Sequence, residues 1–257
     1  GGDQMIVSVA DPDAPCNANA SIVLDGIAPT IQQGNCANTA PSKGTAIDND
    51  VLIHEYGHSF LERILAGPMT PSGRLGVDGD QVGAIHEGFA DYLGLWYELD
   101  INDTPDQGEY IAEYSIGGNE GIRRNPYAHD MTVNPQTFNS WNADVDPDSG
   151  LANNQVHRGG EIWGSALYDL TWELIFKYGG SRDANAMAVA FNEDIYQSVG
   201  GVTGSSGGTP FSPAPGFGTT SGLPITSTLG TDNIDLTSGA NNLALQLIID
   251  GAKLTPS

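Results

Sequence analysis

The stretch HEYGH, residues 54–58, places two histidines four positions apart, with a glutamate directly after the first. It lies within residues 48–65, an apolar run that reads as one helix. On a helix, residues i and i+4 share a face, about 6 Å apart at Cβ, so His54 and His58 can bind one ion. Glu55 lies about 100° further round, where it can reach a water bound to that ion. This arrangement is typical of a zinc site.

The alternative interpretation is a pair of ordinary histidines on a helix surface. The apolar neighbours VLI and FLERIL favour the zinc site instead, because two buried histidines without partners would be costly.

A third ligand is expected from the next helix, residues 82–99. Glu87 follows His58 by 29 residues, and Asp91 shares its helical face. A carboxylate at Asp91 can accept a hydrogen bond from the far nitrogen of a ligand histidine, which fixes the tautomer of that histidine. The alternative for these two acids is an exposed acidic stripe.

Composition narrows the classes of protein to which the chain can belong. Its 257 residues are 39% hydrophobic, as in globular proteins, and carry a net charge of −23 at pH 7. That charge argues against nucleic acid and anionic membranes as partners and favours a secreted, salt-tolerant or calcium-binding protein; a merely solvated acidic surface is the alternative. No apolar run approaches the ~20 residues of a membrane span. No signal peptide is evident, so we expect a mature or trimmed product.

The remaining elements are predicted from periodicity and turn residues. Short strands are expected at residues 5–10 and 21–26, and further helices at residues 157–179, 184–199 and 241–254. Most of residues 100–150 read as loops. The tract 200–231, rich in Gly, Ser, Thr and Pro, is expected to be an exposed loop.

Two weaker signals lie outside the zinc pattern. Asp144, Asp146 and Asp148 alternate before a glycine, as at the start of a calcium loop, although the closing glutamate is missing and a polar surface loop is the alternative. Cys16 and Cys36 can form a disulfide that closes a loop of about twenty residues and contributes roughly 3 kcal/mol, or they can remain free thiols.

These residues together resemble the fungalysin family of zinc metallopeptidases, in the thermolysin-like glutamate-zincin group. HEYGH and the downstream EGFAD are similar to that family's zinc helix and third-ligand helix. Further segments resemble fungalysin segments in the same order, namely NANASIVLDG (17–26), GIRRNPYAHDMTVNP (121–135), VHRGGEIWGSALYDL (156–170) and NNLALQLIIDGAKL (241–254). The resemblance covers about two thirds of the chain.

The resemblance implies an α+β fold, a zincin catalytic domain that is mainly helical with a small β-rich amino-terminal part. Residues 1–47 would be the remnant of a β-rich amino-terminal lobe with the edge strand of the cleft. Residues 48–257 would form the helical zinc-binding catalytic domain, with the loop at 200–231. Because only 53 residues precede His54, we expect most of that lobe to be missing or to lie on another chain, and a propeptide is a further expectation.

The resemblance also implies a role for each residue of the site. The implied roles are zinc binding by His54, His58 and Glu87, general-base catalysis by Glu55, oxyanion stabilisation by His157, support of the zinc ligands by Asp91 and His86, and substrate binding by Arg123, Asn17 and Ala18. His86 is expected to be a partner of His58. The alternatives are that His157 merely begins a helix, that Arg123 pairs with a surface acid, and that Asn17 and Ala18 are turn residues.

The hypothesis that follows is a secreted zinc endopeptidase, which hydrolyses proteins or peptides with a zinc-activated water and a glutamate base. Zinc is the expected cofactor, with calcium as a secondary expectation. The alternatives are a catalytically weak or inactive binding or scaffold domain on the same fold, and an adhesion domain of a larger surface protein.

Overall fold

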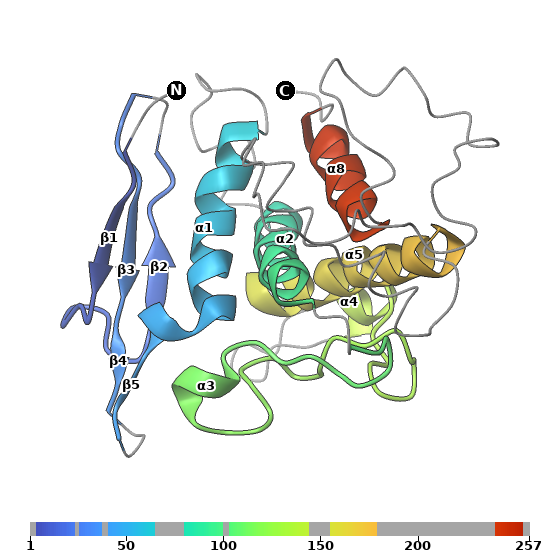
Figure 1. Cartoon of the computed structure of the whole chain (residues 1–257), viewed down its shortest axis with the longest axis horizontal. Helices are drawn as coiled ribbons and strands as arrows, with labels where there is room; N and C mark the ends of the chain where they lie inside the picture. Colours follow the sequence, from blue (N-terminus) through green and yellow to red (C-terminus); the bar gives the residue numbers. More distant parts are fainter. Residues whose placement is uncertain are drawn as a thin grey trace, which may run out of the picture. The chain divides into compact units, whose positions relative to one another are not determined.

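The computed structural model describes residues 4–23, 26–37, 41–64, 80–99, 103–143, 155–178 and 240–253. It is a mixed α+β structure, mainly helical with a small amino-terminal sheet, as the sequence predicts (Figure 1). Two compact units are distinguished: residues 1–98, 105–169 and 249–257 form the first, and residues 99–104 and 170–248 the second. All the described residues with a role predicted from the sequence lie in the first unit. The domain boundary expected at residue 47 stays a prediction.

The amino-terminal sheet has three strands, β1 (Ile6–Val9), β2 (Ala18–Ala20) and β3 (Thr30–Gln33), in the order β1-β3-β2. β1 runs parallel to β3, whereas β2 runs antiparallel to it. β2 is therefore an edge strand, and it lies next to the helix α1 (Asn49–Ile64) (Figure 1).

The strand predicted at residues 21–26 is wrong at the positions that the structure describes, residues 21–23 and 26. Residues 21–23 lie outside every strand, and the segment that pairs with β3 ends at Ala20. The Ser21 amide still donates to the Thr30 carbonyl at 2.8 Å, but the Thr30 amide donates to the Ser21 hydroxyl at 2.7 Å. A side-chain oxygen thus replaces the next backbone acceptor, and the chain leaves the sheet despite the strand-forming residues that follow.

A disulfide joins the beginning of the edge strand to a second, two-stranded sheet. Strands β4 (Asn35–Cys36) and β5 (Lys43–Gly44) pair antiparallel, and Cys36 is bonded to Cys16. The disulfide alternative of the sequence analysis is thereby confirmed. The chain between the two cysteines includes β2 and β3, so the bond fixes one end of the edge strand.

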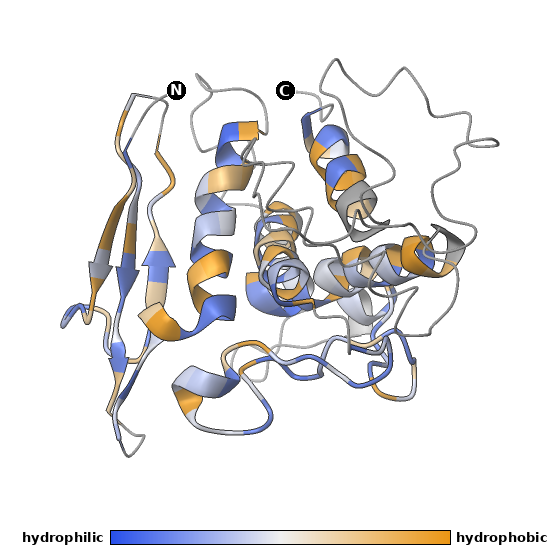
Figure 2. Cartoon of the chain, viewed as in Figure 1, coloured by the Kyte–Doolittle hydropathy of each residue, from blue (hydrophilic) through white to orange (hydrophobic). Residues whose placement is uncertain are grey.

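Four helices agree closely with the ranges predicted from periodicity, namely α1, α2 (Asp80–Glu98), α5 (Val156–Tyr178) and α8 (Ala240–Lys253). Three short helices were not predicted: the 3-10 helix η1 (Thr45–Ile47), and α3 (Glu113–Ile116) and α4 (Ser140–Ala143), which lie in the segment expected to be mostly loops. Hydrophobic residues are visible on α1 and α2 in Figure 2. The helix predicted at 184–199 and the loop predicted at 200–231 lie outside the described residues.

Glycines allow the helices of the first unit to approach closely at the site. A Cβ on Gly57 of α1 would lie 3.0 Å from the Ala90 Cα of α2. A Cβ on Gly160, in the first half of α5, would lie 2.6 Å from the Cβ of Glu87. A larger residue at either position would force the helices apart. Both contacts lie within one turn of a predicted zinc ligand. Because glycine has no side chain, the helices can come close enough at these two positions to bring the ligands together.

The start of α1 is tied to α3 by two carboxylates. The Asp48 carboxylate accepts hydrogen bonds from the Ser115 amide and hydroxyl at 2.8 and 2.7 Å, and the Asp50 carboxylate accepts one from the Ala112 amide at 3.3 Å. Burial, a hydrogen bond with Glu98, and the charges of Glu98 and Asp48 raise the pKa of Asp50 to about 9, although the Ala112 amide opposes this. Asp50 is therefore protonated in the folded chain at neutral pH.

This raised pKa predicts that folding stability falls as the pH rises. Between pH ~4 and ~9 the folded state holds a proton on Asp50 that the unfolded state has lost, so the free energy of unfolding decreases by up to about 1.4 kcal/mol per pH unit. Asp50→Asn keeps an acceptor for the Ala112 amide without the titration, and we expect it to flatten the dependence. Denaturant unfolding of the wild type and of Asp50→Asn at pH 5 and pH 8.5 measures this dependence. If the free energy of unfolding changes equally between the two pH values in both proteins, the prediction is contradicted.

Among the described residues, no helix is both long enough and apolar enough to cross a membrane.

Candidate metal centre

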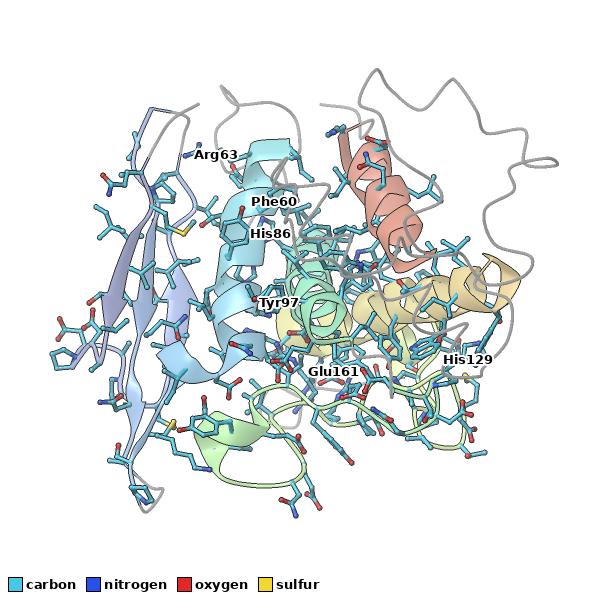
Figure 3. All side chains as sticks on the ribbon, in the orientation of Figure 1. Phe60, Arg63, His86, Tyr97, His129 and Glu161 are labelled. Atoms are coloured by element: carbon cyan, nitrogen blue, oxygen red, sulfur yellow. A yellow bond between two sulfur atoms is a disulfide. The ribbon has the colours of Figure 1, made fainter. Side chains whose placement is uncertain are left out.

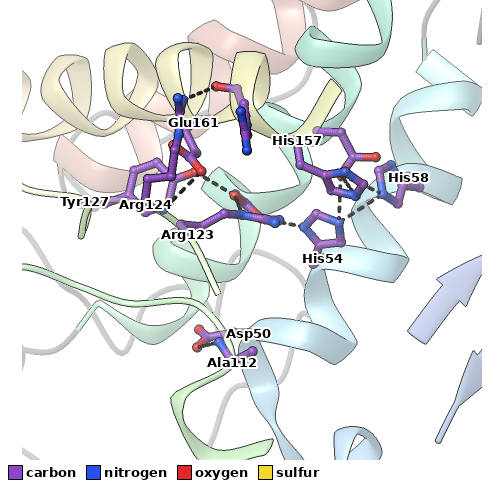
Figure 4. Close-up of polar contacts among 12 residues, drawn as sticks. Asp50, His54, His58, Ala112, Arg123, Arg124, Tyr127, His157 and Glu161 are labelled. Carbon is purple, nitrogen blue, oxygen red and sulfur yellow. Dashed lines mark hydrogen bonds and ion pairs between the residues drawn. The ribbon is translucent and has the colours of Figure 1, made fainter. Parts of the chain in front are cut away.

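Three donor atoms from α1 and α2 converge on one point. The Nε2 atoms of His54 and His58 are 3.0 Å apart, and Glu87 Oε2 lies 3.2 Å from the first and 3.7 Å from the second (Figure 4). In a tetrahedral zinc site with bonds of about 2.0–2.1 Å, the ligand atoms are about 3.3 Å apart. Glu87 Oε2 is also buried without a hydrogen-bond partner. The donor set and its spacing therefore fit zinc, and no other group of this kind is found among the described residues.

Asp91 lies behind His54 and is fully buried. One carboxylate oxygen accepts from His54 Nδ1 at 2.7 Å and from Arg123 Nη2 at 2.6 Å. The other accepts from Arg123 Nε and from the Tyr127 hydroxyl, each at 2.6 Å. The four lone-pair positions of the carboxylate are thus filled by four donors. His54 must carry its proton on Nδ1, which leaves the Nε2 lone pair directed at the metal position.

The electrostatics of the centre favour a cation. Burial alone would lower the pKa of His54, but the carboxylates of Asp91 and Glu87 raise it to about 10. Burial would raise the pKa of Glu87, but a hydrogen bond with His54 and the charges of His54, His58 and His157 lower it to about 2. Burial and the charge on His54 lower the pKa of His58 to about 3. In the absence of metal, one proton on His54 thus supplies the positive charge, and a divalent ion would displace it.

Glu55 faces the same cleft but is not among the three converging donors. Its side chain is buried, and burial raises its pKa to about 7, against the lowering effect of a charged His54. A carboxyl group that titrates near neutrality can both accept and release a proton during a reaction.

His157 lies at the first turn of α5, and its Nε2 is 3.4 Å from Glu87 Oε2. The Gln155 side-chain amide donates to His157 Nδ1 at 3.0 Å, so the proton of the neutral ring is on Nε2, facing the centre. Burial is the largest influence on this ring and lowers its pKa below the ordinary value. His157 can therefore donate a hydrogen bond into the cleft from a neutral ring.

His86 contacts His58, as the sequence analysis anticipates for a partner of that ligand. The two Nδ1 atoms are 2.7 Å apart, and the rings stack with centroids 5.0 Å apart. His86 belongs to α2, and in the view of Figure 3 its label lies over α1, the helix that carries His58.

The Arg123 side chain binds the buried Asp91 and does not extend into the open cleft. Two of its nitrogens bind Asp91, and the side chain is 7% exposed. It also lines a pocket of about 120 Å³ that adjoins His54, Glu55 and His157. The alternative of pairing with a surface acid does not describe this contact, because Asp91 is fully buried.

Asn17 and Ala18 lie at the beginning of the edge strand and line both hollows of the site. The larger hollow, of about 390 Å³, is bordered by residues 17–20 on one side and by His54, Glu55, His58 and Glu87 on the other. Backbone groups of an edge strand are available to a further chain.

Some residues predicted from the sequence to have a role do not take part in these contacts. Asp144, Asp146 and Asp148 lie outside the described residues, and neither the described residues nor the comparisons below support calcium. Conversely, sequence reasoning missed Tyr127 and Gln155. Tyr127 lies in the quoted segment 121–135, but no local pattern tells that its hydroxyl reaches a carboxylate 36 residues earlier.

Comparison with known proteins agrees with this geometry. A sequence model of the family described as fungalysin metallopeptidase (M36) matches residues 1–257. The chain is 30% identical over 179 residues to the extracellular metalloproteinase MEP of Pyricularia oryzae and 31% identical over 179 residues to that of Fusarium vanettenii, in each case 70% of this chain and 26% of the relative. It is 29% identical over 185 residues to extracellular metalloproteinase 3 of Trichophyton tonsurans, which covers 72% of this chain and 27% of the relative. The matched part thus spans about a quarter of these relatives.

Proposed function

The chain belongs to the fungalysin (M36) family of metallopeptidases, and from that premise we propose that it is a secreted, zinc-dependent endopeptidase with Glu55 as general base. The observation that carries the proposal is the approach of His54, His58 and Glu87 to within 3.0–3.7 Å of one another, beside a buried glutamate in a cleft. The extracellular relatives support secretion.

In this proposal His54, His58 and Glu87 hold the metal. When bound, zinc supplies a Lewis acid that polarises a carbonyl and lowers the pKa of a coordinated water towards neutrality. Glu55 takes a proton from the attacking water and delivers it to the leaving amine, which its pKa of about 7 permits. His157 donates a hydrogen bond from its Nε2–H to the carbonyl oxygen as negative charge develops there.

The substrate would lie along the edge strand. Asn17 and Ala18 would contact the peptide backbone in the manner of strand addition, and β2 offers the free edge that this needs. Arg123 lines the smaller pocket, where its positive charge would face the substrate carbonyl. Two of its nitrogens would stay bound to Asp91.

Hydrolysis of a quenched fluorescent peptide by the purified chain, with and without a zinc chelator, tests the proposal. We expect turnover that the chelator abolishes and that added zinc restores. A hydrolysis rate that is unchanged by the chelator would contradict the zinc mechanism. A zinc-loaded chain without turnover would favour the alternative of a scaffold domain.

The smaller pocket predicts a side-chain preference. Its lining holds Glu55 and His157 together with the apolar side chains of Val51, Ile111, Ile116 and Ile122. A peptide with leucine or phenylalanine at the residue beside the scissile bond should therefore be cleaved with a kcat/KM at least about 10-fold above that of the aspartate analogue. The aspartate would lose its hydration beside the Glu55 carboxylate, and Arg123 is already paired with Asp91. Equal values for the two peptides would contradict the assignment of this pocket.

A further inference from the structure

His54 and His58 differ in the hydrogen-bond partner of Nδ1, the ring nitrogen that faces away from the metal position. His54 Nδ1 donates to a carboxylate, Asp91, at 2.7 Å. His58 Nδ1 instead lies 2.7 Å from the Nδ1 of another imidazole, His86. A hydrogen bond between two such nitrogens needs one protonated partner and one with a lone pair, so the tautomers of both rings are linked.

Metal binding decides between the two arrangements. If His58 is to bind through Nε2, its proton must be on Nδ1, and His58 then donates to His86. His86 Nδ1 must accept, so a neutral His86 carries its proton on Nε2. In the opposite arrangement His86 would donate, His58 Nε2 would be protonated, and the ligand would be lost.

The Nε2 atom of His86 is buried and makes no hydrogen bond. A buried donor without a partner destabilises the folded chain, because it has given up its hydrogen bonds with water. The Glu62 Oε2 atom lies 3.9 Å away, at ion-pair distance, on a side chain that is 10% exposed. Glu62 follows His58 by four residues on α1, so it shares the face that meets His86. A slight rotation of Glu62 would bring the carboxylate onto the Nε2 proton.

Resting on the proposed function, we propose that Glu62 is a positioning residue that acts through His86. The Glu62 carboxylate, the His86 ring and the His58 ring form a relay in which each donor points away from the metal position. The relay holds His58 in its metal-binding tautomer, as Asp91 does for His54. Glu62 and His86 also line the larger hollow of the cleft.

Zinc affinity, measured by competition with a chromogenic chelator, tests this relay without recourse to activity. His86→Phe should lower the affinity about 10- to 100-fold, and His86→Asn, whose amide oxygen can accept from His58, should recover most of that loss. Glu62→Met should lower the affinity about 10-fold, and Glu62→Gln, which retains an acceptor, should lower it less. Glu120→Met, the same change at an exposed glutamate, should leave it unaltered.

The relay further predicts that the two effects are not additive. In the His86→Phe background, Glu62→Met should change zinc affinity by less than about twofold, because its route to His58 is gone. Nitrogen-15 spectra of the zinc-loaded chain should show His86 protonated at Nε2. Equal losses from Glu62→Met in both backgrounds, no loss in either, or a proton on His86 Nδ1 would overturn the relay and leave the proposed function standing. A wild-type chain that binds no zinc would overturn both.

Discussion

Replacing Glu55 by glutamine is expected to lower kcat for peptide hydrolysis by about 10³- to 10⁴-fold while zinc remains bound. Glutamine has nearly the same shape but cannot accept the proton of the attacking water. Glu55 is not one of the three converging donors, so the metal site should stay intact. Single-turnover rates and the zinc content of the same preparation measure both parts of the prediction.

Two outcomes would count against this role for Glu55. A variant that keeps more than about a tenth of the wild-type rate would exclude general-base catalysis by this residue. A variant that loses rate and zinc together would indicate a structural role. Glu120→Gln removes the same charge from an exposed position and should leave both quantities unchanged.

Replacing Asp91 by asparagine is expected to have the largest effect on stability. The change leaves the Arg123 guanidinium, 7% exposed, without its counter-charge, and breaking such a buried pair costs about 3–5 kcal/mol. It also removes the carboxylate that fixes the tautomer of His54, so zinc affinity should fall about 10- to 100-fold. Denaturant unfolding of the metal-free chain and chelator competition separate the two effects.

Tyr127→Phe is the matched control for that change. It removes one of the four hydrogen bonds to Asp91 and leaves the charge pair with Arg123 in place. The expected loss is about 1–3 kcal/mol, smaller than for Asp91→Asn. If Asp91→Asn unfolds like the wild type, the carboxylate does not hold the site together.

The two helices that carry the predicted ligands are the part of this structure that the sequence predicts best, because the spacing of residues along one helix decides which side chains share a face. His54 and His58 share a face whenever residues 48–65 are helical, and the same holds for Glu87 and Asp91 on the next helix. The structure places these helices at Asn49–Ile64 and Asp80–Glu98, within two residues of the predicted bounds.

Contacts between distant segments could not be predicted in this way. The bonds from Arg123 and Tyr127 to Asp91 depend on how a loop folds over α2, and no periodicity records that. The strand predicted at residues 21–26 failed for a related reason. Its apolar residues favour a strand, but the Ser21 hydroxyl takes the hydrogen bond that would have continued the ladder. Local preference gave way to one side-chain contact.

The approach of the helices was equally hidden, although its cause is visible in the sequence once the contacts are known. Gly57, between the two ligand histidines, lies against Ala90. Gly160, three residues after His157, lies against Glu87. A glycine in a helix is ordinarily unfavourable by about 1 kcal/mol, so two of them at these positions are a signal of close packing.

X-ray absorption at the zinc edge of the purified chain shows which atoms surround the metal. We expect one zinc per chain, with nitrogen and oxygen neighbours at about 2.0–2.1 Å and the outer-shell signature of two imidazoles, those of His54 and His58. A chain that holds no zinc, or a bound zinc with one imidazole or with three, would contradict this expectation.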